Sequence, residues 1–117
     1  MATPVAAQRR PRAFQDLREY LSAVEAMEQL KVVDGADGEL EIGALTGLIG
    51  ARKDCPVLLF DGIKGYARGW RLATNMLNNA ARQKLIHGCP PEISESEAVR
   101  WWNAEVKKFQ LLLPVFV

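Results

Sequence analysis

The sequence predicts a single small α/β (α+β) domain in which a mixed β-sheet is flanked by about four helices. The length of 117 residues suits one domain of ordinary size. Apolar residues make up 49% of the chain and charged residues 25%, which is typical of a globular protein. Stretches with the apolar spacing of a helix also alternate with short apolar runs of strand length. The formal net charge of +1 excludes a broad positive electrostatic potential that would attract nucleic acid or an anionic membrane.

The N-terminal stretch, residues 1–12, is predicted to be a flexible tail that precedes a domain over residues 13–117. It contains Arg9, Arg10 and Arg12 and no acidic residue. An organelle-targeting leader is the alternative, since such leaders are basic and poor in acids. Prolines and small residues favour the flexible tail.

The first half of the domain predicts a helix, a strand and a second helix. Apolar residues recur at three- and four-residue steps over residues 14–28, which indicates an amphipathic helix. Residues 30–33 form a short β-rich run closed by the turn signal at residues 34–38. Residues 40–49 fit a helix despite two glycines, each of which costs about 1 kcal/mol relative to alanine.

The next segment predicts two strands joined by a glycine-rich loop. Residues 56–60 are continuously apolar, which is typical of a central strand buried on both faces. Residues 62–69 hold three glycines and indicate a loop or a bulged edge. Residues 70–77 are expected to form another strand.

The C-terminal part predicts two further helices and an apolar tail. Either Asn78 or Asn79 can cap a helix that ends at Gly88. A last helix over residues 95–108 is preceded by a serine and a glutamate with the spacing of a capping box. Residues 111–117 are apolar apart from one proline, and such a segment promotes aggregation when it is left uncovered.

No complete catalytic or metal site is visible in the chain. Its one histidine, His87, precedes the helix-ending glycine, where a cation favours the helix C-terminus. Cys55 and Cys89 form no C-x-x-C pair, so we expect buried free thiols. Reduced cysteines predict a cytoplasmic protein.

The glycine-rich loop has two interpretations. Gly62, Gly65 and Gly69 together with Lys64 and Arg68 could cradle a phosphate, because glycine lets backbone N–H groups approach an anion. Their spacing matches no phosphate-binding loop, which favours turn-forming glycines.

Trp101 and Trp102 stand side by side near the start of the last predicted helix. Adjacent helical residues cannot face the same way. We therefore expect one tryptophan to pack in the core and the other to lie at the surface or at a partner.

The chain resembles the N-terminal domain of UbiD-family decarboxylases. Residues 14–21 (FQDLREYL), followed by residues 28–33 (EQLKVV), are similar to the family's opening, in which a "DLR" helix leads into a strand. The resemblance continues at residues 40–42 and is clearest at residues 56–66 (PVLLFDGIKGY). Asn75, Arg82 and Gly88 then look like the family's "N…R…lG" segment, so order and spacing agree across about residues 14–115.

The resemblance implies a fold and a division of labour. Members of the family are long enzymes that use prenylated FMN to decarboxylate, or reversibly carboxylate, aromatic and α,β-unsaturated acids. Their N-terminal α/β domain resembles this chain, whereas a central split-barrel domain carries the flavin, Mn²⁺ and K⁺ and a Glu–Arg–Glu catalytic set. None of those residues has a counterpart here. We therefore expect no catalytic, cofactor-binding or metal residue in this chain, with prenylated FMN, Mn²⁺ and K⁺ in a partner chain or missing domain.

The resemblance implies a non-catalytic N-terminal-domain subunit of a split UbiD-type decarboxylase. This subunit would dock on a larger, prenylated-FMN-bearing chain in a cytoplasmic hetero-oligomer, without nucleic acid or membrane. A fragment of a single-chain decarboxylase and a stand-alone small enzyme or binding protein are the alternatives. The candidate contact residues are Gly62, Lys64, Gly65, Tyr66, Arg68, Trp101 and Trp102.

Overall fold

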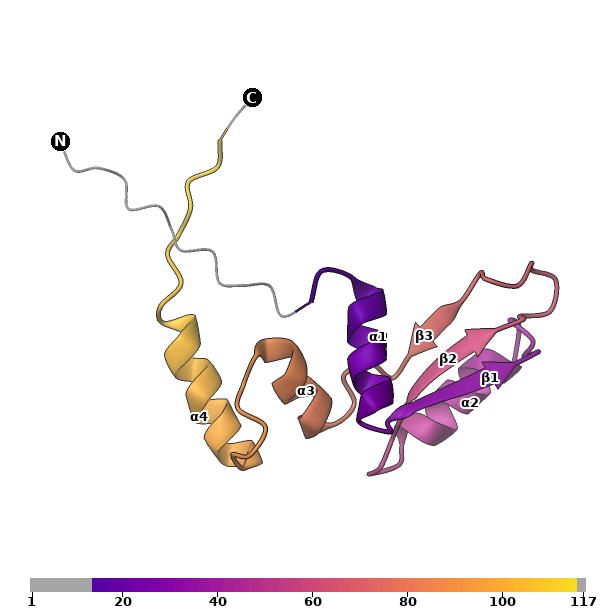
Figure 1. The fold of residues 1–117 in the computed structure, drawn as a ribbon, viewed down its shortest axis with the longest axis horizontal. Coiled ribbons are helices and arrows are strands. Elements are labelled where there is room, and N and C mark those ends of the chain that lie inside the picture. The colour runs from indigo at the N-terminus through magenta and orange to yellow at the C-terminus, as the bar shows by residue number, and fades with distance from the viewer. Residues whose placement is uncertain (1–13, 116–117) are drawn as a thin grey trace.

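The computed structural model describes residues 14–115, so the predicted tail over residues 1–12 lies outside the described residues. The mixed-sheet α/β (α+β) class is confirmed (Figure 1). In chain order the elements are α1 (Leu17–Ala26), β1 (Leu30–Asp34), α2 (Glu41–Gly50), β2 (Val57–Asp61), β3 (Leu72–Thr74), α3 (Ala80–His87) and α4 (Glu95–Val106).

The sheet has the order β1-β2-β3, with β2 in the centre. β1 pairs with β2 in parallel, from Leu30 opposite Val57 to Asp34 opposite Asp61. β3 pairs with β2 in the antiparallel direction, with Ala73 opposite Leu59. The apolar run at residues 56–60 is therefore the central strand that the sequence predicts.

The third strand is shorter than predicted. Residues 70–77 were expected to hold a strand, but β3 spans only Leu72–Thr74. Asn75 has a φ of 58°, in the left-handed region, and this turns the chain out of the extended conformation directly after Thr74. A single asparagine therefore ends the strand.

The two faces of β2 are buried by different helices. Side chains alternate along a strand, so Val57 and Leu59 point to one face and Leu58 and Phe60 to the other. Tyr20, Leu21 and Val24 of α1 pack on the first face. Ala36 and three partly buried side chains of α2 cover the second face: Ile42, Leu45 and Ile49. Both predicted buried free thiols, Cys55 and Cys89, are confirmed.

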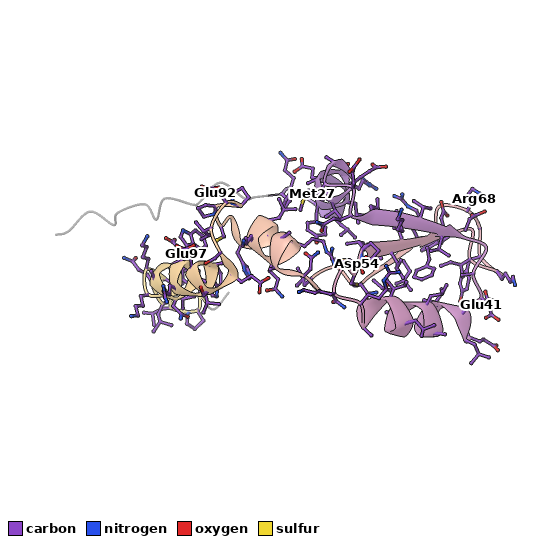
Figure 2. All side chains as sticks on the ribbon, turned by 90° about the horizontal axis from the view of Figure 1, so that it is seen from below. Met27, Glu41, Asp54, Arg68, Glu92 and Glu97 are labelled. Carbon is purple, nitrogen blue, oxygen red and sulfur yellow. The ribbon has the colours of Figure 1, made fainter. Side chains whose placement is uncertain are left out.

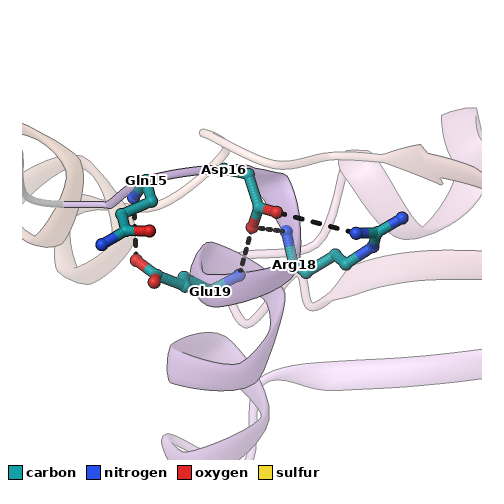
Figure 3. Close-up of polar contacts among 4 residues, drawn as sticks. All are labelled: Gln15, Asp16, Arg18 and Glu19. Atoms are coloured by element: carbon teal, nitrogen blue, oxygen red, sulfur yellow. Dashed lines mark hydrogen bonds and ion pairs between the residues drawn. The ribbon is translucent and has the colours of Figure 1, made fainter.

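The start of α1 is fixed by its own side chains (Figure 3). Asp16 Oδ1 accepts hydrogen bonds from the backbone N–H groups of Arg18 at 2.9 Å and Glu19 at 3.0 Å. The Glu19 carboxylate in turn accepts the backbone N–H of Gln15 at 2.8 Å. These bonds satisfy N–H groups that a helix N-terminus leaves without partners.

The caps of the two C-terminal helices agree with the sequence signals. Of the two candidate asparagines, Asn79 caps α3, where its side chain accepts the backbone N–H of Arg82 at 3.0 Å. Gly88 ends α3 in the left-handed conformation with a φ of 69°. The predicted capping box of α4 is present, because Ser94 and Glu97 each accept the other's backbone N–H.

Helix α4 packs on α3 at the end of the molecule away from the sheet (Figure 1). This position corrects the prediction for the tryptophan pair. Trp101 and Trp102 are both partly buried, and their rings stack on each other with centroids 6.4 Å apart. Neither enters the core, because α4 does not cover the sheet. The Trp102 ring also stacks on the His87 imidazole with centroids 4.3 Å apart.

Arg82 on α3 is fully buried, and its guanidinium is held by neutral oxygen atoms. It donates to the backbone oxygens of Met76 and Asn75, each at 3.0 Å, and to Gln29 Oε1 at 2.9 Å. The Tyr20 hydroxyl also donates to the Met76 oxygen, at 2.6 Å. Burial raises the pKa of Tyr20, and the Arg82 charge partly offsets this effect.

Replacement of Arg82 is expected to destabilise the domain strongly. Arg82→Ala removes three buried hydrogen bonds and a fully buried side chain, so the free energy of unfolding should fall by about 3 kcal/mol. The Met76 and Gln29 oxygens keep the Tyr20 and Asn79 side chains as donors, whereas the Asn75 oxygen loses its donor. Arg82→Lys keeps the charge, but a lysine cannot reach all three oxygens. Its free energy of unfolding should therefore lie between those of wild type and Arg82→Ala. Urea denaturation measures the change. The exposed Arg100 provides the control, since Arg100→Ala should stay within about 0.5 kcal/mol of wild type. Equal stability of both alanine variants would contradict this account.

Candidate partner-binding surfaces

The β2–β3 loop, residues 62–71, is a turn-rich segment rather than a phosphate cradle. Gly62, Gly65 and Gly69 all have positive φ angles, of 58°, 86° and 101°. Asp61 Oδ1 accepts the backbone N–H groups of Gly62 at 2.7 Å and Gly69 at 3.1 Å. A carboxylate therefore occupies two of the donors that a phosphate would need. The Gly69 and Gly62 N–H groups hold the pKa of Asp61 below its usual range.

An ion pair joins the far side of this loop to β1. The Arg68 guanidinium contacts Asp34 through two nitrogen–oxygen pairs, 3.0 and 3.2 Å apart. The hydrogen bond and charge of Asp34 raise the pKa of Arg68. Both side chains are largely exposed, so water screens the pair and its contribution to stability is small. Its geometric effect is to keep the loop against β1.

Two aromatic side chains of the loop are exposed to solvent. Tyr66 is 67% exposed and Trp70 is 70% exposed. Sequence reasoning selected Tyr66, Lys64 and Arg68 but missed Trp70, which it placed in a strand. The position of Trp70 between Gly69 and Arg71, without alternating apolar and polar residues around it, could have indicated that this tryptophan lies in an exposed loop.

A hollow of about 420 Å³ lies between α1 and β3. Sequence reasoning did not find it, because its walls come from segments far apart in the chain. Gly69, Arg71 and Ala73 line it at every second position, as residues on one face of an extended chain do. We call this site the α1–β3 hollow. Its remaining lining residues are Asp16, Leu17, Arg18, Leu21 and Leu59.

A second exposed apolar region comprises a groove beside α4 and the segment that follows this helix. The groove, of about 260 Å³ between α3 and α4, is lined in part by His87, Trp101 and Trp102. The chain then continues into the apolar C-terminal segment, residues 111–115. Its apolar side chains are almost fully exposed: Leu111 by 101%, Leu112 by 84%, Leu113 by 88% and Val115 by 87%.

The structure separates the predicted contact residues into two groups. Gly62, Lys64, Gly65, Tyr66 and Arg68 lie on the β2–β3 loop, at the sheet end of the molecule. Figure 2 shows Arg68 at this end and Glu97 of α4 at the opposite end. The tryptophan pair belongs to the α4 end, so no single continuous patch holds both groups.

The acidic side chains at the loop end of the sheet are already engaged by other groups. Residues 14–115 bring together no group of three or more His, Cys, Asp or Glu side chains that could hold a metal ion. Asp34 and Asp61 are paired in register, but one carboxylate binds Arg68 and the other binds backbone N–H groups. No step of a reaction is therefore assigned to these two acids.

Within the same described residues, no helix has the length and apolar character needed to cross a lipid bilayer.

Alanine at Gly62 is expected to disturb the loop more than alanine at Gly65. Both positions have left-handed backbone, so each substitution should cost about 1 kcal/mol in strain. At Gly62 the added Cβ would also clash with Asp34 Oδ1, which must turn away from Arg68, whereas at Gly65 the space is open. Because that ion pair is largely exposed, urea denaturation should show a loss only about 0.5 kcal/mol larger for Gly62→Ala than for Gly65→Ala. Equal losses would contradict this close approach.

Acid should weaken the loop through Asp61. A carboxyl group whose pKa is lowered by folding stabilises the protein above its unfolded pKa and loses this effect as the pH falls through its folded pKa. Between about pH 5 and pH 3, the free energy of unfolding should therefore fall more steeply for wild type than for Asp61→Asn. Denaturation at a series of pH values measures the difference. Parallel curves would show that the Asp61 charge is not held by Gly62 and Gly69.

The comparisons with known proteins point to one family. The model of the 3-octaprenyl-4-hydroxybenzoate carboxy-lyase N-terminal domain matches residues 21–99. Three solved structures of the vanillic acid decarboxylase ShVdcCD from Sedimentibacter hydroxybenzoicus are also similar: an open form, a closed form, and an open form with truncated ShVdcD. Each is 28% identical with a TM-score of 0.72, over 82% of this chain and 20% of that one. A search of curated proteins gives no match.

The matched region contains the whole sheet, Arg82 and the β2–β3 loop. The family resemblance predicted from the sequence is thereby confirmed. This chain spans about one fifth of the length of the similar decarboxylase chains. It belongs to the UbiD family, as an N-terminal domain of the carboxy-lyase type.

Proposed function

We propose that this chain is a non-catalytic N-terminal domain of a UbiD-type decarboxylase and that it docks on a prenylated-FMN-bearing polypeptide. The substrate would be an aromatic or α,β-unsaturated carboxylic acid. The family match supports this proposal, as does the similarity to a vanillic acid decarboxylase, whose named substrate is an aromatic acid. We call the proposed partner the flavin-bearing polypeptide. It is either a separate chain or the remainder of one continuous chain expressed separately.

The observation that carries the docking proposal is the exposure of the apolar C-terminal segment. Its leucine and valine side chains are between 84% and 101% exposed. Complete burial of such a side chain is favourable by roughly 1.5–3 kcal/mol. Contiguous exposed apolar surface of this kind marks a protein interface or promotes aggregation. A covering protein surface therefore stabilises this end of the domain.

The same region continues onto α4. Val99 and Val106 are 61% and 42% exposed, and Phe109 beyond the helix is 58% exposed. Helix α4 packs mainly on the short helix α3, and these apolar side chains of α4 remain open to a partner. The groove beside Trp101 and Trp102 lies at the same end and would be covered by the same contact.

The roles of the two parts differ in this proposal. Prenylated FMN, with Mn²⁺ and K⁺, would reside on the flavin-bearing polypeptide and supply the decarboxylation chemistry when bound. This chain contributes a folded surface that contacts the partner. The free, buried cysteines agree with a cytoplasmic assembly. The near-neutral charge agrees with a protein partner rather than nucleic acid or a membrane surface.

Association with the flavin-bearing polypeptide should depend on the apolar C-terminal segment. Wild-type chain, co-expressed with that polypeptide, should co-elute with its flavin absorbance in size-exclusion chromatography. The double variant Leu112→Glu/Leu113→Glu should raise the Kd at least roughly tenfold, because it places two charges in the buried contact.

Gln110→Glu is the control for this experiment. It adds a charge beside the segment without removing an apolar side chain, and it should bind about as wild type does. Absence of wild-type co-elution would refute the docking proposal. Decarboxylation by this chain alone with added prenylated FMN would refute the non-catalytic role and support a stand-alone enzyme.

A further inference from the structure

We infer that the α1–β3 hollow is a second docking site, one that receives an apolar side chain flanked by carboxylates on the flavin-bearing polypeptide. This inference rests on the proposed function and adds the chemistry of the contact. Its walls come from α1 and from the segment that leads into β3, and both lie on the side of α3 away from α4 (Figure 1). The partner would therefore contact the domain at a second place besides the α4 end.

The floor of the hollow is apolar. Leu21 and Leu59 are only 8% and 7% exposed, and Ala73 beside them is partly buried. Leu17 forms one wall and is 49% exposed, although Tyr20, Leu21 and Val24 of the same helix are packed in the core. Part of this sheet face is thus left uncovered by α1. An inserted apolar side chain would complete the packing that α1 begins.

The rim of the hollow carries cations without strong partners. Among residues 14–115, Arg71 makes no hydrogen bond and no ion pair. The pKa of Asp61 is lowered chiefly by the Gly69 and Gly62 N–H groups, and the Arg71 charge adds a smaller effect. Within the part of the chain that the structure describes, the one ion pair of Arg18 is with Asp16, at 3.9 Å, and Asp16 already accepts two backbone N–H groups (Figure 3). Carboxylates from outside the domain would complement these guanidinium groups.

The nearby acids of this domain do not supply that complement. The sequence has no acidic residue between Asp61 and Glu92, a stretch that includes Arg71 and β3. Asp61 itself is engaged by the Gly62 and Gly69 N–H groups. Charge complementarity therefore indicates an acidic partner surface. Nucleic acid is disfavoured, because only two arginines border an apolar floor and the net charge is +1.

The part of the β2–β3 loop that bears Arg71, residues 69–71, is held in place by hydrogen bonds before any partner binds. The N–H of Gly69 is bonded to Asp61, and the N–H of Trp70 is bonded to the Ala67 oxygen at 3.3 Å. The 70% exposed Trp70 lies between two residues that line the hollow. Exposed tryptophan and arginine on a pre-ordered loop are typical of residues that dominate binding energy, because little freedom is lost on association.

Binding of the flavin-bearing polypeptide to three charge or packing variants tests the inference. Arg71→Glu should raise the Kd at least roughly tenfold at about 50 mM NaCl, and Leu17→Asn should weaken binding by a similar factor. Lys53→Glu makes the same charge reversal in the exposed turn between α2 and β2, and it should bind within about twofold of wild type. Titration calorimetry measures the Kd, and thermal unfolding of each variant verifies that it remains folded.

Salt provides a second readout. Between about 50 and 300 mM NaCl the Kd of wild type should rise, and it should rise less for Arg71→Glu. If wild type binds and Arg71→Glu binds equally well, the hollow is not the docking site, while the proposed function stands. If wild type does not bind at all, the proposed function fails and this inference fails with it.

Two other occupants would also overturn the inference. Self-association of the chain alone in sedimentation, abolished by Arg71→Glu, would identify a second copy as the occupant. Displacement of the flavin-bearing polypeptide from wild type by a short single-stranded DNA would identify nucleic acid.

Discussion

The buried guanidinium of Arg82 is the constraint on which the connection between the two ends of the domain depends. A cation withdrawn from water is tolerated only when its N–H groups find acceptors, and here those acceptors are all neutral. Gln29 follows α1, Asn75 and Met76 follow β3, and Arg82 lies on α3. Forming this one set of hydrogen bonds therefore requires three segments to be in their native positions together. Tyr20 adds α1 to the same set through the Met76 oxygen.

The rest of the architecture is uneven because the core is concentrated on one strand. Of the strands formed by residues 14–115, β2 alone has a continuous buried run, and α1 and α2 cover its two faces. Beyond α3 the chain contributes little to this core, and α4 is attached through α3 rather than through the sheet. The domain thus has a well-packed end and a sparsely packed end. The most exposed apolar side chains, those of residues 111–115, belong to the sparsely packed end.

Local signals made much of the fold predictable, whereas long-range contacts did not. The capping box at Ser94 and the glycine that ends α3 act within a few residues, so the sequence shows them directly. The length of β3 depended on the left-handed backbone of Asn75, and the strand-like composition of residues 70–77 gives no indication of it. The placement of the tryptophan pair depended on where α4 docks. The α1–β3 hollow joins segments that are distant in the chain, which periodicity cannot reveal. Asp61 closes its loop locally, through Gly62 and Gly69, but the apolar pattern carries no sign of those hydrogen bonds.

The distribution of tryptophan gives the domain its own optical reporters. The chain has three tryptophans, of which Trp101 and Trp102 stack at the α4 end and Trp70 is exposed beside the hollow. None of them lies in the buried core. The tryptophan fluorescence of this protein consequently originates from its two surface regions rather than from its interior, where Tyr20 is the buried aromatic residue of α1. The emission of Trp70, isolated by replacing the stacked pair, distinguishes events at one end of the molecule from events at the other without an added label.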